Sequence, residues 1–541
     1  MKKIYGITVA LIISVSAKTQ ETNTYHGAFA PAPTESWTND WVNWNPQLTN
    51  YNPTFKEVIE VISTITTNTT WNSDKVYLLK GQIFVTDNAT LTIPAGTIIM
   101  GEKAALGACL VITRGAKLIA NGTKTSPIVF TSDQDANSRT TGDWGGIVIL
   151  GKAKNNQAGG QAYIEGFANS TNTQFGGSDD ADSSGSLKFV RIEYCGFAYA
   201  PNKEINGLTL GSVGSGTKLE NIQVSYCNDD AFEWFGGTVN AKYLVSYRNL
   251  DDDFDTDYGY RGKVQFALGI KDPTIADNPS VSTSEGIESD NDATGSNALP
   301  QTSATFSNIT LVGPLRGNPS ASTSTSFAAG HRRAVRIRRN SAQKVENSIF
   351  IDFKTGLHID GIACETNTTT NNLVFKNNII AGRATTGKFG EVNAAVYNTD
   401  GTLKTAASTF KIYDFLLSNN NDTITSSTGI LTNPYDYFNP DYRPQPVAAG
   451  IKSIETSISQ ISIYPNPSEG DFSLKIESEK NHLININISD ISGKIVNTIT
   501  NTQLIEGLNT IDFKELDLNQ GTYFVTIQSN GNQKTIKLAI N

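Results

Sequence analysis

The 541-residue chain contains little cysteine and little histidine, four residues of each. The cysteines (Cys109, Cys195, Cys227 and Cys364) are too few for the disulfide framework that holds small secreted domains together, and their spacing matches no zinc motif. Four histidines exclude a histidine-rich metal site. The fold must therefore depend on apolar packing, for which a chain of this length has ample material.

Charge is also scarce, because charged residues make up 18% of the chain and the net charge is −9. A nucleic-acid-binding protein would need a basic face, so we expect no nucleic-acid partner. After the N-terminal segment no apolar run is long enough to cross a bilayer, so we expect no transmembrane span in the mature chain. The 46 glycines and 18 prolines spread along the chain argue against a coiled coil. The composition favours a β-rich, turn-rich protein of two to four domains.

The N-terminus has the layout of a secretory signal peptide. Lys2 and Lys3 precede an apolar stretch over residues 4–15, and small residues follow up to Ala17. We expect residues 1–20 to be a signal peptide cleaved after Ala17 or Gln20; the alternative is a buried N-terminal strand. The chain is therefore predicted to be exported.

The C-terminal end forms a separate module. A linker over residues 439–457 is rich in proline and glycine. From residue 458 to 541 short alternating strands, such as 472–476 and 523–527, are split by glycine-containing turns. This spacing predicts a small antiparallel, immunoglobulin-like β-sandwich.

Several motifs in this module resemble the C-terminal sorting domain of type IX secretion cargo. They are Tyr464-Pro465-Asn466-Pro467, the turn that ends at Gly493, the segment with Gly521 and Tyr523, and a final strand from Lys534. The resemblance implies the type IX secretion machinery as a partner, in a Gram-negative cell. It also implies a protein that is secreted or anchored on the outer cell surface. The alternative is a generic adhesion module.

The middle of the chain, residues 76–438, repeats short strand phrases around an asparagine. Asn221, Asn308, Asn347 and Asn377 stand in such phrases, and two similar strands are 21 positions apart. This period fits one three-strand coil of a right-handed parallel β-helix. The expected fold class is therefore all-β, a β-helix followed by the small sandwich.

Three segments of the middle region resemble secreted bacterial β-helix proteins that are related in architecture to pectate lyases. They are residues 142–146, 229–239 and 251–255. No activity is settled for that group, so the resemblance implies a fold and not a reaction.

For two segments next to the expected coils, the sequence allows two interpretations each. Residues 21–75, with four of the six tryptophans (Trp37, Trp41, Trp44 and Trp71), are expected to cap the first coil; a carbohydrate-binding lead segment is the alternative. Residues 268–304 form an insertion that contains Glu285 and Asp292. This insertion is either a lid or a long excursion, and we expect disorder.

Aligned coils place two columns of polar side chains on one outer face. Successive strand residues point to opposite faces, so Phe232 and Phe254, with Val335 and Leu357, are expected to point inward. The first outward column is then Glu233, Asp255, Arg336 and His358, and the second is Phe235, Asp257, Arg338 and Asp360.

Acidic residues beside these columns predict a calcium site. Crowded carboxylates repel one another unless a cation neutralises them, and calcium binds six to eight oxygen ligands. We expect the ligands among Asp229, Asp230, Asp252, Asp255 and Asp257, with Asp251 and Asp253 close by.

The resemblance to pectate-lyase-like enzymes also implies a candidate reaction. In those enzymes calcium binds the uronate and an arginine or lysine removes a proton from it. Arg336 or Arg338 could serve in this way, with Glu233 and Asp255 in the same site and Lys263 as a further candidate base. The alternative is a surface ladder in which the arginines pair with the acids.

Three classes of function remain open. The chain is a polysaccharide lyase or glycoside hydrolase, an adhesion protein that binds acidic polysaccharide, or a structural surface protein. Cys195 and Cys227 follow tyrosines at matching repeat positions, so they either pair across neighbouring coils or stay reduced and buried. We favour the buried, reduced state.

Overall fold

The computed structural model describes two compact units, one on either side of the Gly450–Ile451 bond. The described residues are 25–30, 36–51, 56–200, 203–280, 282–315, 328–382, 388–398, 402–425, 458–478, 480–490, 494–514, 516, 518–529 and 532–541. The expected signal peptide (1–20) and linker (439–457) lie outside them. Within the described residues, no helix has the length and apolarity that a membrane crossing requires.

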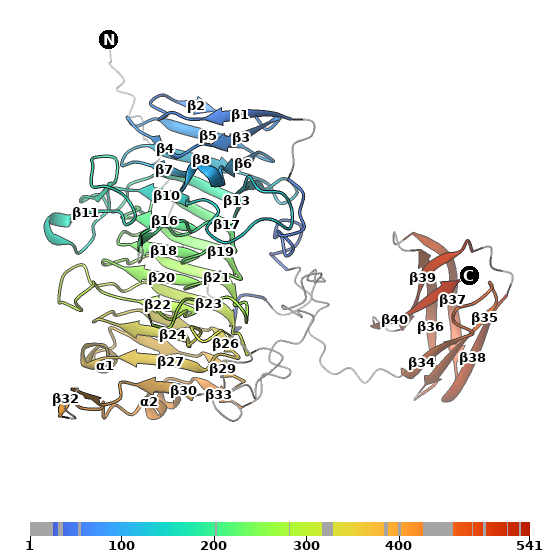
Figure 1. Ribbon diagram of the computed structural model, residues 1–541. Coiled ribbons are helices and arrows are strands. Elements are labelled where there is room, and N and C mark those ends of the chain that lie inside the picture. The colour runs from blue at the N-terminus through green and yellow to red at the C-terminus, as the bar shows by residue number, and fades with distance from the viewer. Residues whose placement is uncertain are drawn as a thin grey trace, which may run out of the picture. The chain divides into compact units, whose positions relative to one another are not determined.

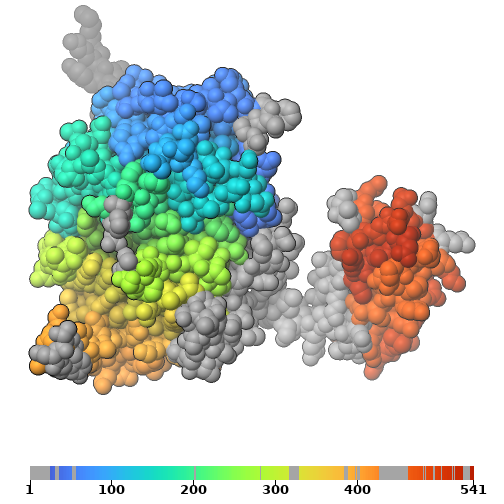
Figure 2. Space-filling view, viewed as in Figure 1, coloured from blue at the N-terminus to red at the C-terminus, as the bar shows by residue number. Residues whose placement is uncertain are grey.

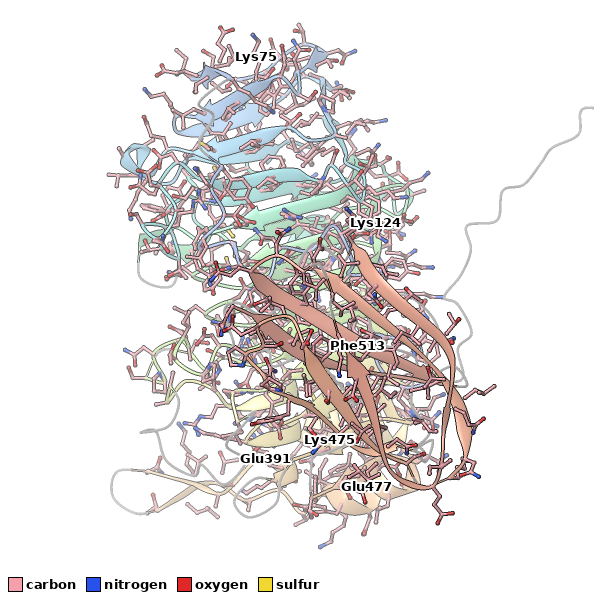
Figure 3. The ribbon with its side chains drawn as sticks, turned by 90° about the vertical axis from the view of Figure 1, so that its right-hand side faces the viewer. Lys75, Lys124, Glu391, Lys475, Glu477 and Phe513 are labelled. Carbon is pink, nitrogen blue, oxygen red and sulfur yellow. The ribbon has the colours of Figure 1, made fainter. Side chains whose placement is uncertain are left out.

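The first unit is a right-handed parallel β-helix whose coils follow one another in chain order (Figures 1 and 2). Lys75 near the first coil and Glu391 near the last mark its two ends (Figure 3). The strands belong to two large parallel sheets. The larger sheet contains β1 (Glu57–Val61), β2 (Thr69–Thr70), β3 (Lys75–Leu79), β5 (Thr90–Pro94), β6 (Ile98–Gly101), β8 (Lys117–Asn121), β9 (Ile128–Ser132), β13 (Gly185–Glu193), β17 (Lys218–Ser225), β19 (Asn240–Tyr247), β21 (Lys263–Ile270), β23 (Thr305–Val312), β25 (Lys344–Glu346), β26 (Ile349–Ile351), β28 (Val374–Lys376), β29 (Ile379–Ala381) and β33 (Asp422–Ile424).

The smaller sheet forms the face that carries the predicted columns. Its residues at inward positions join those of the larger sheet in one continuous apolar core. Its ten strands are β4 (Gln82–Val85), β7 (Cys109–Ile112), β10 (Gly146–Leu150), β16 (Leu208–Gly211), β18 (Phe232–Phe235), β20 (Phe254–Asp257), β22 (Ile287–Ser289), β24 (Arg333–Arg338), β27 (Thr355–Asp360) and β30 (Lys388–Val392).

The repeated asparagines mark a bend in the coil. Asn221, Asn308, Asn347 and Asn377 all have φ between 53° and 55°. Asparagine tolerates this left-handed conformation better than most residues. The asparagine of each phrase is therefore a bend within the larger sheet, with strand residues of that sheet on both sides of it.

Short elements decorate the coils. They are η1 (Lys103–Ala105), η2 (Ala158–Gly160), α1 (Ile362–Thr369), α2 (Ile412–Ser418) and three antiparallel pairs: β11 (Gln161–Tyr163) with β12 (Gln174–Gly176), β14 (Ala198–Ala200) with β15 (Lys203–Glu204), and β31 (Val396–Tyr397) with β32 (Leu403–Thr405).

The described part of the lead segment, residues 25–30 and 36–51, lies along the outer face of the larger sheet and does not cap the first coil. Trp41 packs edge-on against Phe189 of β13, and Trp44 packs against Tyr247 of β19. Ala28 donates its backbone N–H to Thr310 Oγ1 of β23. This arrangement corrects the expected cap, because the outer face has its own apolar side chains that need cover. Figure 1 shows this dark blue segment beside the green middle coils.

Polar contacts tie the lead segment to the coils beneath it. Asn43 exchanges two hydrogen bonds with the side chain of Gln223, at 2.8 and 2.7 Å. Tyr51 donates its hydroxyl to the buried Glu193 at 2.9 Å. We call residues 25–30 and 36–51 the strap.

The β-helix begins earlier than the predicted residue 76. Glu57 opens β1, which pairs in parallel with β3, and β2 pairs with β5. Of the four tryptophans expected in a cap, Trp71 alone lies near the first coil, where its ring stacks on Tyr77 at 4.2 Å. Residues 57–75 are thus part of the solenoid.

Cys195 and Cys227 are free and fully buried. The reduced state favoured from the sequence is therefore the one that the structure contains.

The second unit is an antiparallel sandwich with its own apolar core. Tyr464 ends β34 and is exposed, while Asn466 bonds through its side chain to the backbone of Lys537 and Ala539. Gly521 opens β39, and Tyr523 donates its hydroxyl to the carbonyl of Asn519 at 2.9 Å. Gly493 lies outside the described residues. The two sheets consist of β34 (Ile458–Tyr464), β35 (Phe472–Ser478) and β38 (Gly507–Phe513), and of β37 (Ile495–Leu504), β36 (His482–Asp490), β39 (Gly521–Ser529) and β40 (Asn532–Ile540).

Candidate functional site

The outward column on the smaller sheet contains one residue more than expected. The pairing runs from Glu233 to Asp255, then to Glu288, and only then to Arg336 and His358. The inward neighbours Phe232, Phe254, Ile287, Val335 and Leu357 are fully buried, as alternation requires. The predicted alignment of strands is confirmed, whereas the placement of Arg336 in the coil next to Asp255 is wrong.

The extra coil comes from the segment that was expected to be disordered. Ile287–Ser289 forms β22, and Glu285 and Glu288 are buried. The connection from β21 to β22 is long, and β22 has only three residues. For these two reasons the strand was not recognised in the sequence. This strand adds an acid to the column.

The second column also gains a carboxylate. Asp257 follows Phe235 in register, and Arg338 pairs with Asp360. Between them Asp290 accepts hydrogen bonds from Arg338 Nε and Arg339 Nη1, each at 2.7 Å.

A pocket of about 540 Å³ opens over the acidic part of this face, and we call it the acidic pocket. Its lining has ten carboxylates and two arginines. Among the described lining residues there is no aromatic ring and one aliphatic side chain, Leu250. The lining residues are Glu165, Glu204, Asn206, Asn228, Asp229, Asp230, Glu233, Leu250, Asp251, Asp252, Asp255, Asp277, Ser282, Glu288, Arg338 and Arg339.

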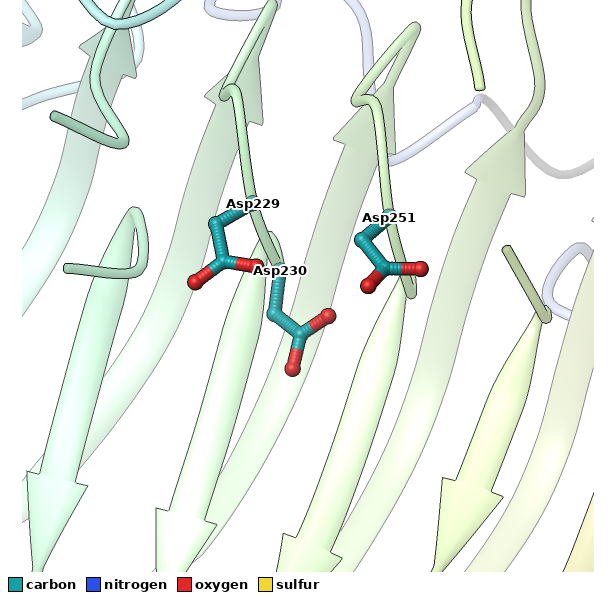
Figure 4. Close-up of side chains that lie close together, drawn as sticks. All are labelled: Asp229, Asp230 and Asp251. Atoms are coloured by element: carbon teal, nitrogen blue, oxygen red, sulfur yellow. The ribbon is translucent and has the colours of Figure 1, made fainter. Parts of the chain in front are cut away.

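Three overlapping groups of these acids could each hold a metal ion. Within each group, one carboxylate oxygen per residue lies within 4.8 Å of the others. Figure 4 shows the first group, in which Asp251 comes from the coil after that of Asp229 and Asp230. The groups are Asp229, Asp230 and Asp251; Asp230, Glu233 and Asp255; and Asp252, Asp255 and Glu288.

Hydrogen bonds between neighbouring coils hold these acids in place. Asp230 accepts a hydrogen bond from the backbone N–H of Asp252 at 2.8 Å, and Asp252 in turn accepts one from the backbone N–H of Glu285. Glu233 accepts one from the side-chain amide of Asn206. Each contact links one coil to its neighbour, so the carboxylates are fixed in position by the solenoid.

Burial and mutual repulsion perturb the acids of the pocket. Burial, and then the charge of Asp252, raises the pKa of Asp230 well above its ordinary range. Burial, and then the charge of Glu288, does the same to the pKa of Asp255. Burial raises the pKa of Glu288 to about 7, although Arg338 opposes the shift. Without a cation the pocket therefore resists full ionisation.

The pocket also contains oxygen atoms that lack any hydrogen-bond partner. They are Oδ1 of Asp251, Oδ1 of Asp255 and the amide Oδ1 of Asn206. Buried polar atoms are nearly always satisfied, so each of these calls for a partner. A hard cation that binds carboxylate and carbonyl oxygens, as calcium does, fits this set of donors.

The candidate catalytic arginines lie in ion pairs. Arg336 contacts Glu288 at 3.3 Å and Asp360 at 2.7 Å. Although burial acts in the opposite direction, Glu288 and Asp290 raise the pKa of Arg338 above its ordinary value. An arginine that is held protonated by two carboxylates cannot accept a proton.

The structure brings together most of the predicted site residues. Glu233, Asp229, Asp230, Asp252 and Asp255 line the acidic pocket together with Arg338, whereas Asp257 and Arg336 do not. Burial, and then the charge of Asp290, raises the pKa of Asp257 to about 8. Lys263 opens β21 in the other sheet and is not among the lining residues.

Sequence reasoning missed Glu165 and Asp277, which come from connections between strands, and Glu204, which ends the short strand β15 outside the two large sheets. A strand register indicates nothing about how such connections fold over a face. Glu288 is different, since its phrase Gly-Ile-Glu-Ser alternates as a strand does and offered a detectable signal.

Comparisons with known proteins agree with this architecture. Residues 63–423 match the family model of the pectate-lyase-like β-helix domain, and residues 462–541 match that of the secretion system C-terminal sorting domain. The second match identifies type IX secretion cargo, which is released from a Gram-negative cell or anchored on its outer surface. No curated protein shows significant similarity to the chain.

Two crystal structures show a distant likeness. The Dettilon tailspike protein is 10% identical, with 90% of this chain and 85% of that chain covered and a TM-score of 0.22. The enzymatically active domain of bacteriophage CBA120 tailspike protein 2 is 11% identical, with 86% and 72% covered and a TM-score of 0.20. Such scores indicate no detailed structural correspondence. The β-helix match, by contrast, spans about two thirds of the chain, so the protein belongs to the family with the pectate-lyase-like β-helix domain.

Proposed function

We propose that this exported β-helix protein binds acidic polysaccharide outside the cell and that calcium in the acidic pocket makes this binding possible. The observation that carries the proposal is the lining of ten carboxylates with two arginines. So dense a negative charge attracts divalent cations and, without them, repels a polyanion.

The ligand class follows from the same charge balance. Calcium takes more oxygen ligands than one group of three acids supplies, so coordination positions remain for oxygens from outside the protein. A uronate carboxylate is an oxygen donor of the required kind. Arg339, whose side chain is 41% exposed, adds a positive group at the margin.

Binding assays with defined glycans test the proposal. Full-length protein should bind pectin, alginate or an ulvan-type uronate in millimolar calcium and lose this binding in EDTA. Asp255→Asn should weaken binding at least tenfold, while Asp135→Asn, at an exposed acid outside the pocket, should leave it unchanged. Equal binding in calcium and EDTA would contradict the proposal, as would binding to a neutral glucan with the same affinity.

A second candidate is a glycoside hydrolase that uses the same acids. It is favoured by the raised pKa of Glu288, about 7, and by the unpartnered oxygen of Asp255, because a general acid must remain protonated near neutral pH. New reducing ends from a uronate polymer, lost in Glu288→Gln, would support it.

The lyase hypothesis receives less support from the geometry, since both arginines lie in ion pairs. Release of unsaturated sugar, detected by ultraviolet absorbance and abolished by Arg336→Ala, would reinstate it. A protein that neither cuts nor binds any uronate polymer would instead be structural.

A further inference from the structure

The three candidate metal groups in the acidic pocket are not independent. Asp230 belongs to both the first and the second group, and Asp255 belongs to both the second and the third. The groups follow the order of the coils, because β18, β20 and β22 are paired neighbours in one sheet. Neighbouring strands lie roughly 4.8 Å apart, a separation that one carboxylate with two oxygens can bridge.

A second observation points to ligands along the whole row. Asn206 is 4% exposed, lines the pocket and has an unpartnered amide oxygen beside Glu233 of the second group. Asp251 of the first group has an unpartnered oxygen, and so does Asp255, which the second and third groups share. Unsatisfied oxygens thus accompany every group.

The charges of the row show how many cations it needs. The three groups contain seven different carboxylates and therefore up to seven negative charges. One Ca²⁺ would leave five of these charges unbalanced, whereas three would leave one. At the end of the row Arg336 and Arg338 contact Glu288 and, with Arg339, also pair with the outside acids Asp360 and Asp290. Three arginines against these two acids leave one positive charge, which balances the remainder.

We infer that the acidic pocket holds a row of three calcium ions, with Asp230 and Asp255 each shared between two neighbouring ions. The inference rests on the proposed calcium dependence of the same site and adds its stoichiometry and its bridging residues. A row of this kind leaves several cations facing one pocket, which suits a ligand with repeated carboxylates better than a single sugar acid.

Counting the bound ions in variants tests the inference. Full-length protein, dialysed against low calcium and then titrated with calcium alone, should bind three ions per chain by elemental analysis. Asp251→Asn, which alters the first group alone, should bind two. Asp255→Asn, which alters the second and third groups, should bind one, and the matched control Asp135→Asn should bind three.

A second measurement protects the test against misfolded variants. Wild-type protein loaded with a mixture of terbium and europium should show energy transfer from one ion to the other, because the sites adjoin. Asp255→Asn should abolish this transfer if circular dichroism shows an intact fold.

Each possible outcome is decisive. One or two bound calcium ions in the wild type, or equal losses in Asp251→Asn and Asp255→Asn, overturn the row of three but leave calcium-dependent binding of polysaccharide standing. No bound calcium overturns both proposals.

Discussion

The smaller sheet presents two adjacent regions whose charges are balanced in different ways. On β24, β27 and β30 basic and acidic side chains pair with one another: Arg333 contacts Glu391 at 2.5 Å, and Arg336 contacts Asp360 at 2.7 Å. On β18 and β20 the column residues Glu233 and Asp255 have other acids as neighbours and no ion pair among the described contacts.

The difference shows what each region requires from its surroundings. In the paired region the charges neutralise one another within the chain, so these ion pairs contribute to the stability of the fold. In the acidic region Glu233 and Asp255 have no ion pair among the described contacts, and burial raises the pKa values of both, so these carboxylates must bind protons or an external cation. One face of the solenoid therefore contains a region whose charges are neutralised within the chain and a region whose charges require an added cation.

Removal of calcium should lower the stability of the folded state more than any of the substitutions below. At a calcium concentration about a hundred times the dissociation constant, one bound ion stabilises the folded state by about 2.7 kcal/mol. Thermal unfolding at pH 8 should therefore occur at a clearly lower temperature in EDTA than in calcium. An unchanged midpoint would mean that the acidic region needs no cation.

The pH dependence of the calcium-free protein sharpens this test. The pKa values of Asp257, about 8, and Glu288, about 7, are raised above their ordinary values, so the folded state binds more protons than the unfolded state between about pH 4 and pH 8. Stability should fall as the pH rises through this window. Saturating calcium should remove the trend, and a calcium-free protein that gains stability from pH 5 to pH 8 would contradict the argument.

Arg336→Ala should have the next largest effect. It leaves Glu288 and Asp360 without their shared guanidinium, and we expect a loss of about 2 kcal/mol in the free energy of unfolding, measured by denaturant titration. Arg336→Lys should recover part of the loss because it keeps the charge. The loss should be smaller in calcium than in EDTA, because Glu288 also belongs to the third metal group and a bound cation can neutralise it.

Asp255→Asn should change the free energy of unfolding by a smaller amount and, without calcium, in the opposite direction. In EDTA at pH 8 it removes a charge that burial and neighbouring acids disfavour, so we expect a gain of about 1 kcal/mol. In calcium the variant should be less stable than the wild type, because it has lost a ligand. A destabilised variant under both conditions would place Asp255 among the structural charges.

Glu346→Gln should have the smallest effect. Glu346 pairs with Lys376 at 3.3 Å on the larger sheet, where the lysine side chain is 47% exposed. Exposed pairs contribute little, so we expect less than about 0.5 kcal/mol by denaturant titration. A loss as large as that of Arg336→Ala would show that burial does not separate the two kinds of pair.

Much of this face could be predicted from alternation alone. The pairing of Phe232 with Phe254 sets the register, and the column positions of Glu233, Asp255, Arg336 and His358 follow from it. Glu288 was missed because its strand has three residues and follows a long connection. An alignment that lacks this coil places the arginines next to Asp255 and gives no sign of their ion pairs with Glu288 and Asp290.

The strap marks a different limit of prediction. Its tryptophans indicated burial, but burial does not specify a partner. The first coil and the outer sheet face both needed apolar cover, and the apolar outer positions that the strap covers, such as Tyr247 and Ile351, are distant in sequence from Trp41 and Trp44. Composition alone could not show whether these tryptophans cover the first coil or the outer face of the larger sheet.

The strap also has a consequence for the order of folding. Ala28 bonds to Thr310, 282 residues later, and Asn43 bonds to Gln223, 180 residues later. Contacts so far apart in the chain cannot form until the intervening coils have brought their ends together, which slows folding more than it lowers stability. During that time Trp41 and Trp44 remain exposed to water. The segment that is synthesised first among the described residues is therefore expected to be the last part of the β-helix unit to fold.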